Sequence, residues 1–121
     1  AGEWFVAATL RLQGGDARGL LEANKKLLEK RGTSQPTQQP NAGSVFRNPG
    51  GDFAARLIES AGLKGCGTGM AQVSEKHANF IVNRGRATAA DVRRLIENCH
   101  ALVLKTYGID LEPEVEFVGE W

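Results

Sequence analysis

The chain opens with a segment in which apolar side chains recur at every second position. Within residues 3–13 one face carries five apolar residues, Trp4, Val6, Ala8, Leu10 and Leu12. A repeat of two is the spacing of a strand, so a strand is predicted there. Leucines at helical spacing follow Asp16, a good N-cap, and predict a helix to about Lys30 that Gly32 terminates.

The periodic pattern is lost after this helix, where Pro, Gly and Gln dominate. Residues 33–41 have the composition of a linker, and residues 44–47 could form only a short strand. The small residues around this strand would let the backbone approach a ligand closely. Ser44, Arg47 and Asn48 place hydrogen-bond donors together at that point.

A second helix is predicted between Asp52, as its N-cap, and Gly62, at its C′ position. Three glycines follow at every second position, Gly65, Gly67 and Gly69. A phosphate-binding loop would follow a buried strand and open a helix, whereas here a helix comes first and no Gly-Lys-Ser/Thr follows. We therefore expect a turn.

The last third of the chain mixes strands with one long helix. Residues 80–82 predict a short buried strand, and Thr88 opens a capping-box variant for a helix that Gly108 ends. A final strand is expected over residues 109–118, interrupted at Pro113. Strands and helices do not alternate regularly, so the predicted fold class is α+β.

Composition agrees with one small globular domain, or one with a short appendage. The chain has 121 residues, of which 41% are hydrophobic and 24% charged. Fifteen basic and fourteen acidic side chains give a net charge of +1. This near-balance argues against nucleic acid or an anionic membrane as the main partner. No apolar run reaches the roughly 18 residues of a membrane span and no signal peptide opens the chain, so a cytoplasmic protein is expected.

The cysteines and histidines do not form a metal-binding pattern. Cys66 and Cys99 lie far apart, and adjacent residues such as Cys99 and His100 point to different sides of a helix. No metal site is expected, and two unpaired thiols suit a reducing compartment, although counting leaves one disulfide possible. Cys99 falls on the apolar stripe of its helix and is interpreted as a core residue.

Three residues are candidates for chemistry. Ser44 could be a nucleophile, a proton donor or a turn serine, and it lacks the Gly-x-Ser-x-Gly elbow of an esterase. His77 precedes a buried strand and could be a ligand contact or a hydrogen-bonded structural histidine. Glu114 lies between apolar residues, where burial would raise its pKa, or it could be a charge that protects a sheet edge. These residues alone indicate a domain that binds a small, polar, anionic ligand.

Several motifs in order resemble one known family. They are Pro40-Asn-Ala-Gly-Ser-Val-Phe-Arg-Asn-Pro49, Arg56-Leu-Ile-Glu-x-Ala-Gly-Leu-Lys-Gly65, Ala71-Gln-Val-Ser-Glu-Lys-His-Ala-Asn-Phe-Ile-Val-Asn83, Ala87-Thr-Ala-Ala-Asp-Val92 and Leu111-Glu-Pro-Glu-Val115. Together they resemble the shorter form of UDP-N-acetylenolpyruvoylglucosamine reductase, also called UDP-N-acetylmuramate dehydrogenase. The resemblance implies an oxidoreductase of peptidoglycan synthesis, and so of cell-wall biogenesis, cell shape and cell division. The implied enzyme reduces UDP-N-acetylglucosamine enolpyruvate to UDP-N-acetylmuramate with NADPH through FAD.

The resemblance also implies roles for individual residues. Ser44 corresponds to the family's proton donor to the enolate-like carbon, and Glu114 to its active-site glutamate. Asn48 corresponds to a contact to the substrate diphosphate. Arg47 stands where lysine is commoner, and His77 occupies a position near the substrate.

In this family an N-terminal domain binds FAD. Residues 1–32 resemble the last strand and helix of that flavin-binding region, and residues 33–121 resemble the C-terminal substrate-binding domain. The chain is therefore expected to be a small mixed α/β substrate-binding domain with a strand-helix remnant of the flavin-binding region. We expect no cofactor-binding residue within it, and no activity without the missing FAD-binding domain as its partner. The alternative is a stand-alone nucleotide-sugar-binding module that performs no catalysis.

Overall fold

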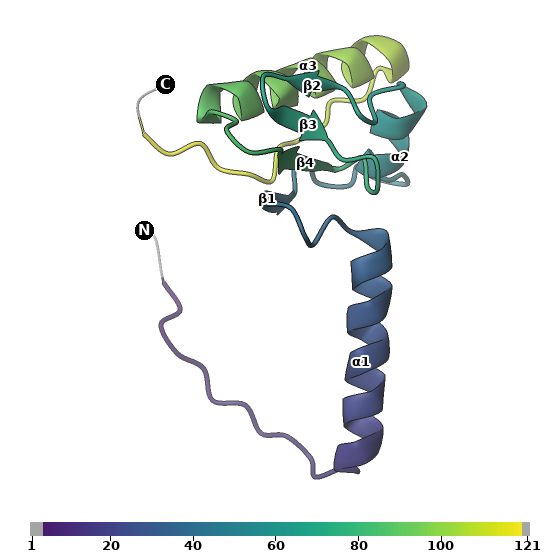
Figure 1. The fold of residues 1–121 in the computed structure, drawn as a ribbon, viewed down its shortest axis with the longest axis vertical. Coiled ribbons are helices and arrows are strands. Elements are labelled where there is room, and N and C mark those ends of the chain that lie inside the picture. Colours follow the sequence, from purple (N-terminus) through teal and green to yellow (C-terminus); the bar gives the residue numbers. More distant parts are fainter. Residues whose placement is uncertain (1–3, 120–121) are drawn as a thin grey trace.

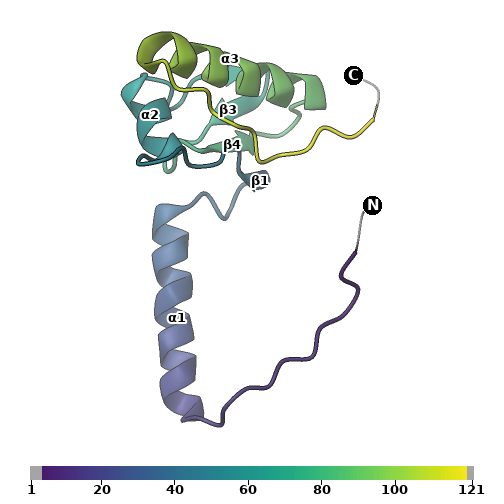
Figure 2. The same ribbon diagram turned by 180° about the vertical axis from the view of Figure 1, so that it is seen from behind.

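The structure is a computed structural model that describes residues 4–119. Its elements, in chain order, are α1 (Ala17–Ser34), β1 (Asn41–Ser44), α2 (Ala54–Ser60), β2 (Gly67–Thr68), β3 (Ala71–Val73), β4 (Phe80–Asn83) and α3 (Ala89–Tyr107). The strands form one antiparallel sheet in the order β1-β4-β3-β2. Helix α3 lies across this sheet and α2 packs beside it, whereas α1 extends away (Figures 1 and 2). The predicted α+β class is confirmed.

The core fills the space between the sheet and α3. Buried apolar side chains come from α2, β3, β4 and α3 and from the adjoining loops, and Val73, Leu57 and Val103 are fully enclosed. The predicted long helix is confirmed in detail. Thr88 and Asp91 form the capping box, and Gly108 ends the helix in the left-handed conformation at φ 68°.

Cys99 lies on the buried face of α3, as predicted, at 1% exposure. Burial raises the pKa of its thiol to about 12, because a thiolate would lose its hydration there. Cys66 is exposed, and neither cysteine forms a disulfide.

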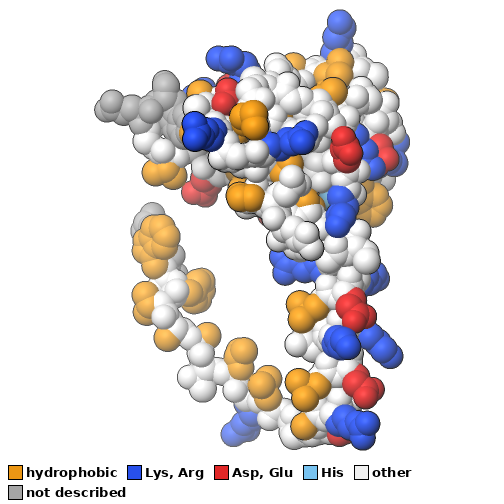
Figure 3. Space-filling view, viewed as in Figure 1, with side chains coloured by type: hydrophobic (Ala, Val, Ile, Leu, Met, Phe, Trp, Pro, Cys, Tyr) orange, Lys and Arg blue, Asp and Glu red, His pale blue; other side chains and the backbone are white. Residues whose placement is uncertain are grey.

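The N-terminal part differs from the prediction. Residues 4–15 form neither helix nor strand, so the strand predicted over residues 3–13 is wrong for the described part of that range. A strand needs a neighbour to satisfy its backbone hydrogen bonds, and this segment pairs with no described strand. Its apolar side chains are exposed, as are the leucines of α1 (Figure 3).

Helix α1 begins as predicted, because the Asp16 side chain accepts hydrogen bonds from the backbone N–H groups of Arg18 and Gly19 at 3.1 and 2.9 Å. It continues through Gly32 to Ser34, beyond the predicted end. A glycine weakens a helix by only about 1 kcal/mol, so one glycine does not have to end it.

The three-glycine run forms a turn, as expected, rather than a phosphate loop. Gly65 and Gly69 have φ of 75° and 57°, and the unpredicted strands β2 and β3 form a short hairpin there. At Gly67 an added Cβ would lie 2.9 Å from the carbonyl oxygen of Ala71. This close approach of two backbones explains why the position requires glycine.

The final strand predicted over residues 109–118 is also wrong. This segment makes only an isolated bridge between Phe46 and Pro113, flanked by two backbone hydrogen bonds. Arg47 N–H donates to Glu112 O at 2.9 Å, and Glu114 N–H donates to Val45 O at 2.8 Å. Proline has no N–H to donate, which limits the pairing to these neighbours.

The short strand expected at residues 44–47 lies three residues earlier, at Asn41–Ser44. The strand expected at residues 80–82 is confirmed as β4. Within residues 4–119 no helix is both long and apolar enough to cross a bilayer.

Candidate active site

Four of the five residues singled out in the sequence line one small cavity. Ser44, Asn48, His77 and Glu114 surround a space of about 170 Å³. The remaining walls come from Phe46, Phe53, Ala55 and Asn79. The four polar residues come from the end of β1, the loop after it, the turn before β4 and the segment after α3, so the fold brings together positions up to 70 residues apart.

Ser44 and Glu114 are held by adjoining backbone. Ser44 is half-buried and pairs with Phe80 in the β1–β4 ladder. Glu114 is tied to the residue after Ser44 through its N–H, which donates to Val45 O at 2.8 Å. The Glu114 side chain is exposed, so the burial considered from its apolar neighbours is wrong.

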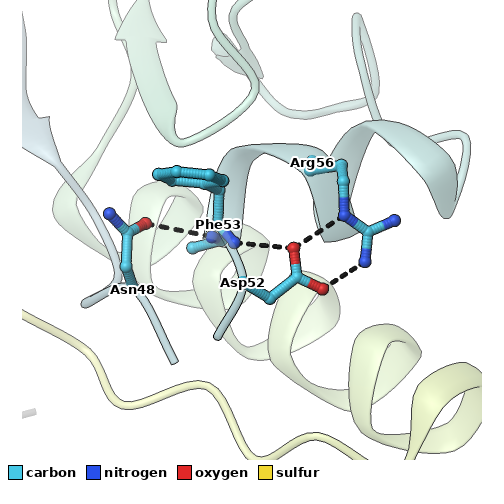
Figure 4. Close-up of polar contacts among 5 residues, drawn as sticks. Asn48, Asp52, Phe53 and Arg56 are labelled. Atoms are coloured by element: carbon cyan, nitrogen blue, oxygen red, sulfur yellow. Dashed lines mark hydrogen bonds and ion pairs between the residues drawn. The ribbon is translucent and has the colours of Figure 1, made fainter. Parts of the chain in front are cut away.

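Asn48 has a structural contact that fixes the orientation of its carboxamide. Its Oδ1 atom accepts a hydrogen bond from Ala54 N–H, at the start of α2, at 3.1 Å (Figure 4). The N-cap residue of that helix, Phe53, supplies no side-chain cap. Because the oxygen is engaged by the helix, the NH₂ group is left to donate to a ligand.

Asp52, predicted as the N-cap, has a different role. Its Oδ1 atom accepts from the N–H of its neighbour Phe53 at 2.7 Å and from Arg56 Nε at 2.6 Å, and its Oδ2 atom pairs with Arg56 Nη2 (Figure 4). The hydrogen bond from Arg56, followed by that from Phe53, lowers the pKa of Asp52 to about 2. The cap prediction is wrong because the Ala54 N–H at the start of the helix donates to Asn48, six residues earlier, and not to Asp52.

His77 is both a hydrogen-bonded histidine and a wall of the cavity. Its Nδ1 atom accepts from Asn79 N–H at 3.3 Å, so its proton lies on Nε2. The ring packs edge-on against Phe80, with centroids 4.8 Å apart. Burial, followed by the positive charge of Lys64, lowers the pKa of His77. The imidazole is therefore neutral near neutral pH and can donate one hydrogen bond.

Arg47 does not line this cavity. Its Nη1 atom forms an ion pair with Glu112 Oε1 at 3.0 Å, and both side chains are more than half exposed. Such exposed pairs contribute little to stability.

Sequence reasoning missed Asn79, the most buried of the polar side chains that line the cavity. Asn79 is 4% exposed, and both its carboxamide atoms bond the backbone of Phe46. An asparagine directly before a buried strand was the available signal. No group of three or more His, Cys, Asp or Glu within residues 4–119 could hold a metal ion.

A small α+β domain that combines a serine, a carboxylate and two hydrogen-bond donors in one cavity is a candidate for binding an anionic ligand and moving a proton. The family model "UDP-N-acetylenolpyruvoylglucosamine reductase, C-terminal domain" matches residues 35–118. The chain belongs to this family, as the motifs indicated.

Relatives and solved structures agree with this assignment. A UDP-N-acetylenolpyruvoylglucosamine reductase of Alkalilimnicola ehrlichii is 58% identical over 99% of this chain, and one of Methylococcus capsulatus is 60% identical over 98%. The crystal structure of the Thermus caldophilus reductase matches 88% of this chain at 37% identity with a TM-score of 0.73. The chain spans about two fifths of the length of these relatives, between 37% and 40%.

Proposed function

We propose that this chain is the substrate-binding part of an enzyme that reduces UDP-N-acetylglucosamine enolpyruvate to UDP-N-acetylmuramate, a cytoplasmic step of peptidoglycan synthesis. One observation carries the proposal: Ser44, Asn48, His77 and Glu114 line a single cavity in a chain that belongs to this family. A module that only bound nucleotide sugars would have no need for the serine and the glutamate together.

Ser44 is the proton donor in this proposal. Reduction of the enolpyruvyl double bond adds a hydride to one carbon and leaves enolate-like charge on its neighbour. The Ser44 O–H bond then breaks as a C–H bond forms at that neighbour, and the alkoxide regains its proton from water. A hydroxyl is a weak acid, so the step depends on placing it in contact with a strongly basic carbon.

The other residues orient the substrate. The free NH₂ of Asn48 suits a diphosphate oxygen, and the Nε2–H of neutral His77 offers a second donor. The Glu114 carboxylate, which lines the same cavity as Ser44, can accept a hydrogen bond from the water that returns a proton to the serine alkoxide. Arg47 lies on the outer surface beside Glu112 and is assigned only a secondary contact to the substrate.

The cavity can receive only part of so large a substrate, at the points where Ser44 and Asn48 are proposed to contact it. Its 170 Å³ is below the roughly 300–1,000 Å³ of typical ligand pockets. Ser44 also lines a second cavity of about 730 Å³ with Arg31 and Gln35, which offers room for the remainder of the UDP-sugar. The serine therefore stands between the two spaces.

In this proposal residues 33–121 hold no flavin, and the cavity of about 170 Å³ that Ser44 shares with Glu114 is smaller than typical ligand pockets. FAD and NADPH would supply the hydride from a flavin-binding region outside residues 33–121, and the resemblance assigns residues 1–32 to the end of that region. The chain by itself should therefore be inactive.

Reconstitution tests this proposal. The chain is produced alone and joined to the flavin-binding region of the Methylococcus capsulatus relative, and NADPH oxidation is followed with UDP-N-acetylglucosamine enolpyruvate. We expect substrate-dependent oxidation only in the joined protein. A yellow, active preparation of the chain alone would refute the assignment of the flavin, and a joined protein that binds flavin but never reduces substrate would refute the function.

A further inference from the structure

Asn79 is unusual among the described polar residues because it is buried and its side chain bonds a single residue through both its acceptor and its donor. Its Oδ1 atom accepts the N–H of Phe46 at 3.0 Å, and its Nδ2 atom donates to the carbonyl oxygen of Phe46 at 2.8 Å. Its exposure is 4%. Two antiparallel bonds to one residue reproduce the pairing of a neighbouring strand, here made by a side chain.

This pairing continues the β1–β4 ladder beyond its irregular end. The register of β1 against β4 shifts between Asn41 and Ser44, and backbone pairing then ends with Val45 N–H, which donates to Asn79 O at 2.9 Å. The Asn79 carboxamide takes over at the next residue, Phe46. The tract from Ser44 to Phe46 is therefore fixed to the start of β4.

The same tract carries the segment that holds Glu114. Phe46 forms the isolated bridge with Pro113, and Val45 O accepts the N–H of Glu114 at 2.8 Å. Ser44 and Glu114 thus reach the cavity from two segments that meet at residues 45 and 46. The side chain that fixes this meeting point is Asn79.

We propose that Asn79 is a positioning residue whose carboxamide sets the placement of the Ser44 hydroxyl relative to the Glu114 carboxylate. This inference rests on the proposed function for its consequence in substrate binding, and on the hydrogen bonds alone for the geometry. Asn79→Asp keeps the size and the acceptor but removes the donor, which leaves the buried carbonyl of Phe46 facing a carboxylate. A buried polar group without its partner is expensive, so the tract should separate from β4.

A matched control exists at the other end of β4. The Asn83 Oδ1 atom accepts from Gly85 N–H and Ala87 N–H at 2.9 and 3.0 Å, within its own turn. Asn83→Asp therefore makes the same chemical change on the same strand without touching the tract that bears Ser44.

The test uses nuclear magnetic resonance on the full chain, with and without UDP-N-acetylglucosamine enolpyruvate. In Asn79→Asp we expect amide exchange at Val45 and Glu114 to rise by about tenfold or more, and substrate affinity to fall by about tenfold or more. In Asn83→Asp the amide exchange rates and the substrate affinity should both stay at the values of the unmodified chain. This should hold even if the melting temperature of Asn83→Asp falls as much as that of Asn79→Asp. Unchanged exchange and affinity in Asn79→Asp would overturn the inference.

The two proposals can fail separately. If the unmodified chain binds no substrate, the proposed function loses its support, while the exchange rates at Val45 and Glu114 still decide the role of Asn79. If Asn79→Asp does not fold, the side-chain NH₂ protons of Asn79 in the unmodified chain decide it. Protection like that of a sheet amide supports the inference, and exchange as fast as at the exposed Asn24 overturns it.

Discussion

Asn48 is assigned two roles that substitution can separate. Its Oδ1 atom caps α2 through Ala54 N–H, and its NH₂ group is proposed to contact the substrate diphosphate. Asn48→Ala removes both groups. Asn48→Asp keeps an acceptor oxygen for the helix end but replaces the donor with a negative charge.

The structure sets the size of each effect. Loss of a helix cap costs about 1 kcal/mol, which for a domain of this size lowers the melting temperature by about 4–8 °C. Asn48→Ala should show that loss, whereas Asn48→Asp should stay within about 0.5 kcal/mol, since an acid at a helix N-terminus is favourable. A new charge about 4 Å from a phosphate costs about 1–4 kcal/mol in affinity, depending on how much water screens it.

Thermal denaturation and calorimetric titration with UDP-N-acetylglucosamine enolpyruvate measure the two effects. We expect Asn48→Asp to fold normally and bind about fivefold to several hundredfold more weakly. Asn98→Asp, which adds the same charge on the exposed surface of α3, controls for net charge. Normal binding by Asn48→Asp would refute the diphosphate contact, and normal stability of Asn48→Ala would refute the cap.

Three further predictions concern the domain itself. Because the pKa of Asp52 is lowered from 3.8 to about 2, its ionised form stabilises the folded state above about pH 4, and this contribution is progressively lost as the pH falls through 2. Asp52→Asn should therefore lower the melting temperature at pH 7 much more than at pH 2, and an equal effect at both would exclude the pairing with Arg56 as the cause. A thiol reagent at pH 8 should modify Cys66 alone in the folded chain and Cys99 only in denaturant; two rapid equivalents without denaturant would show that α3 does not bury its thiol. Leu57→Ala, at a fully buried site, should cost about 2–5 kcal/mol in chemical denaturation, and a cost below about 1 kcal/mol would contradict the described core.

Local signals in the sequence were sufficient for the elements whose stabilising contacts are local. The capping box at Thr88, the apolar stripe of α3 and the C-terminal Gly108 all lie within one helix, and each was predicted. The glycine turn after α2 was likewise predicted from its own residues. These features need no knowledge of distant neighbours.

Elements that depend on distant partners were predicted poorly. The alternation of residues 3–13 indicates a strand, but a strand forms only where another strand receives its hydrogen bonds. The segment after α3 makes only one bridge, because Phe46 is its neighbour and proline stands at the contact. Asn48, and not the predicted Asp52, caps α2 for the same reason, because the cap comes from a loop that folds back onto the helix end.

The candidate site was also predicted only in part, because its individual residues could be found in the sequence but their grouping depends on the fold. Physical reasoning nominated Ser44, His77 and Glu114 individually and grouped Arg47 and Asn48 with Ser44 as donors, and family resemblance gave the roles. Only the fold brings these four residues to one cavity and leaves Arg47 outside it. Asn79 escaped notice because its importance lies in two bonds to a residue 33 positions away.

The proposed function depends on Ser44 as the proton donor during substrate reduction. The most direct test is Ser44→Ala in the protein joined to a flavin-binding region, with flavin reduction and flavin reoxidation by substrate followed separately in a stopped-flow instrument. Ser60→Ala, at an exposed serine of α2, serves as the matched control. We expect normal flavin reduction by NADPH and a loss of at least about 100-fold in reoxidation by UDP-N-acetylglucosamine enolpyruvate. Equal losses in both steps, or normal reoxidation, would contradict this role of Ser44.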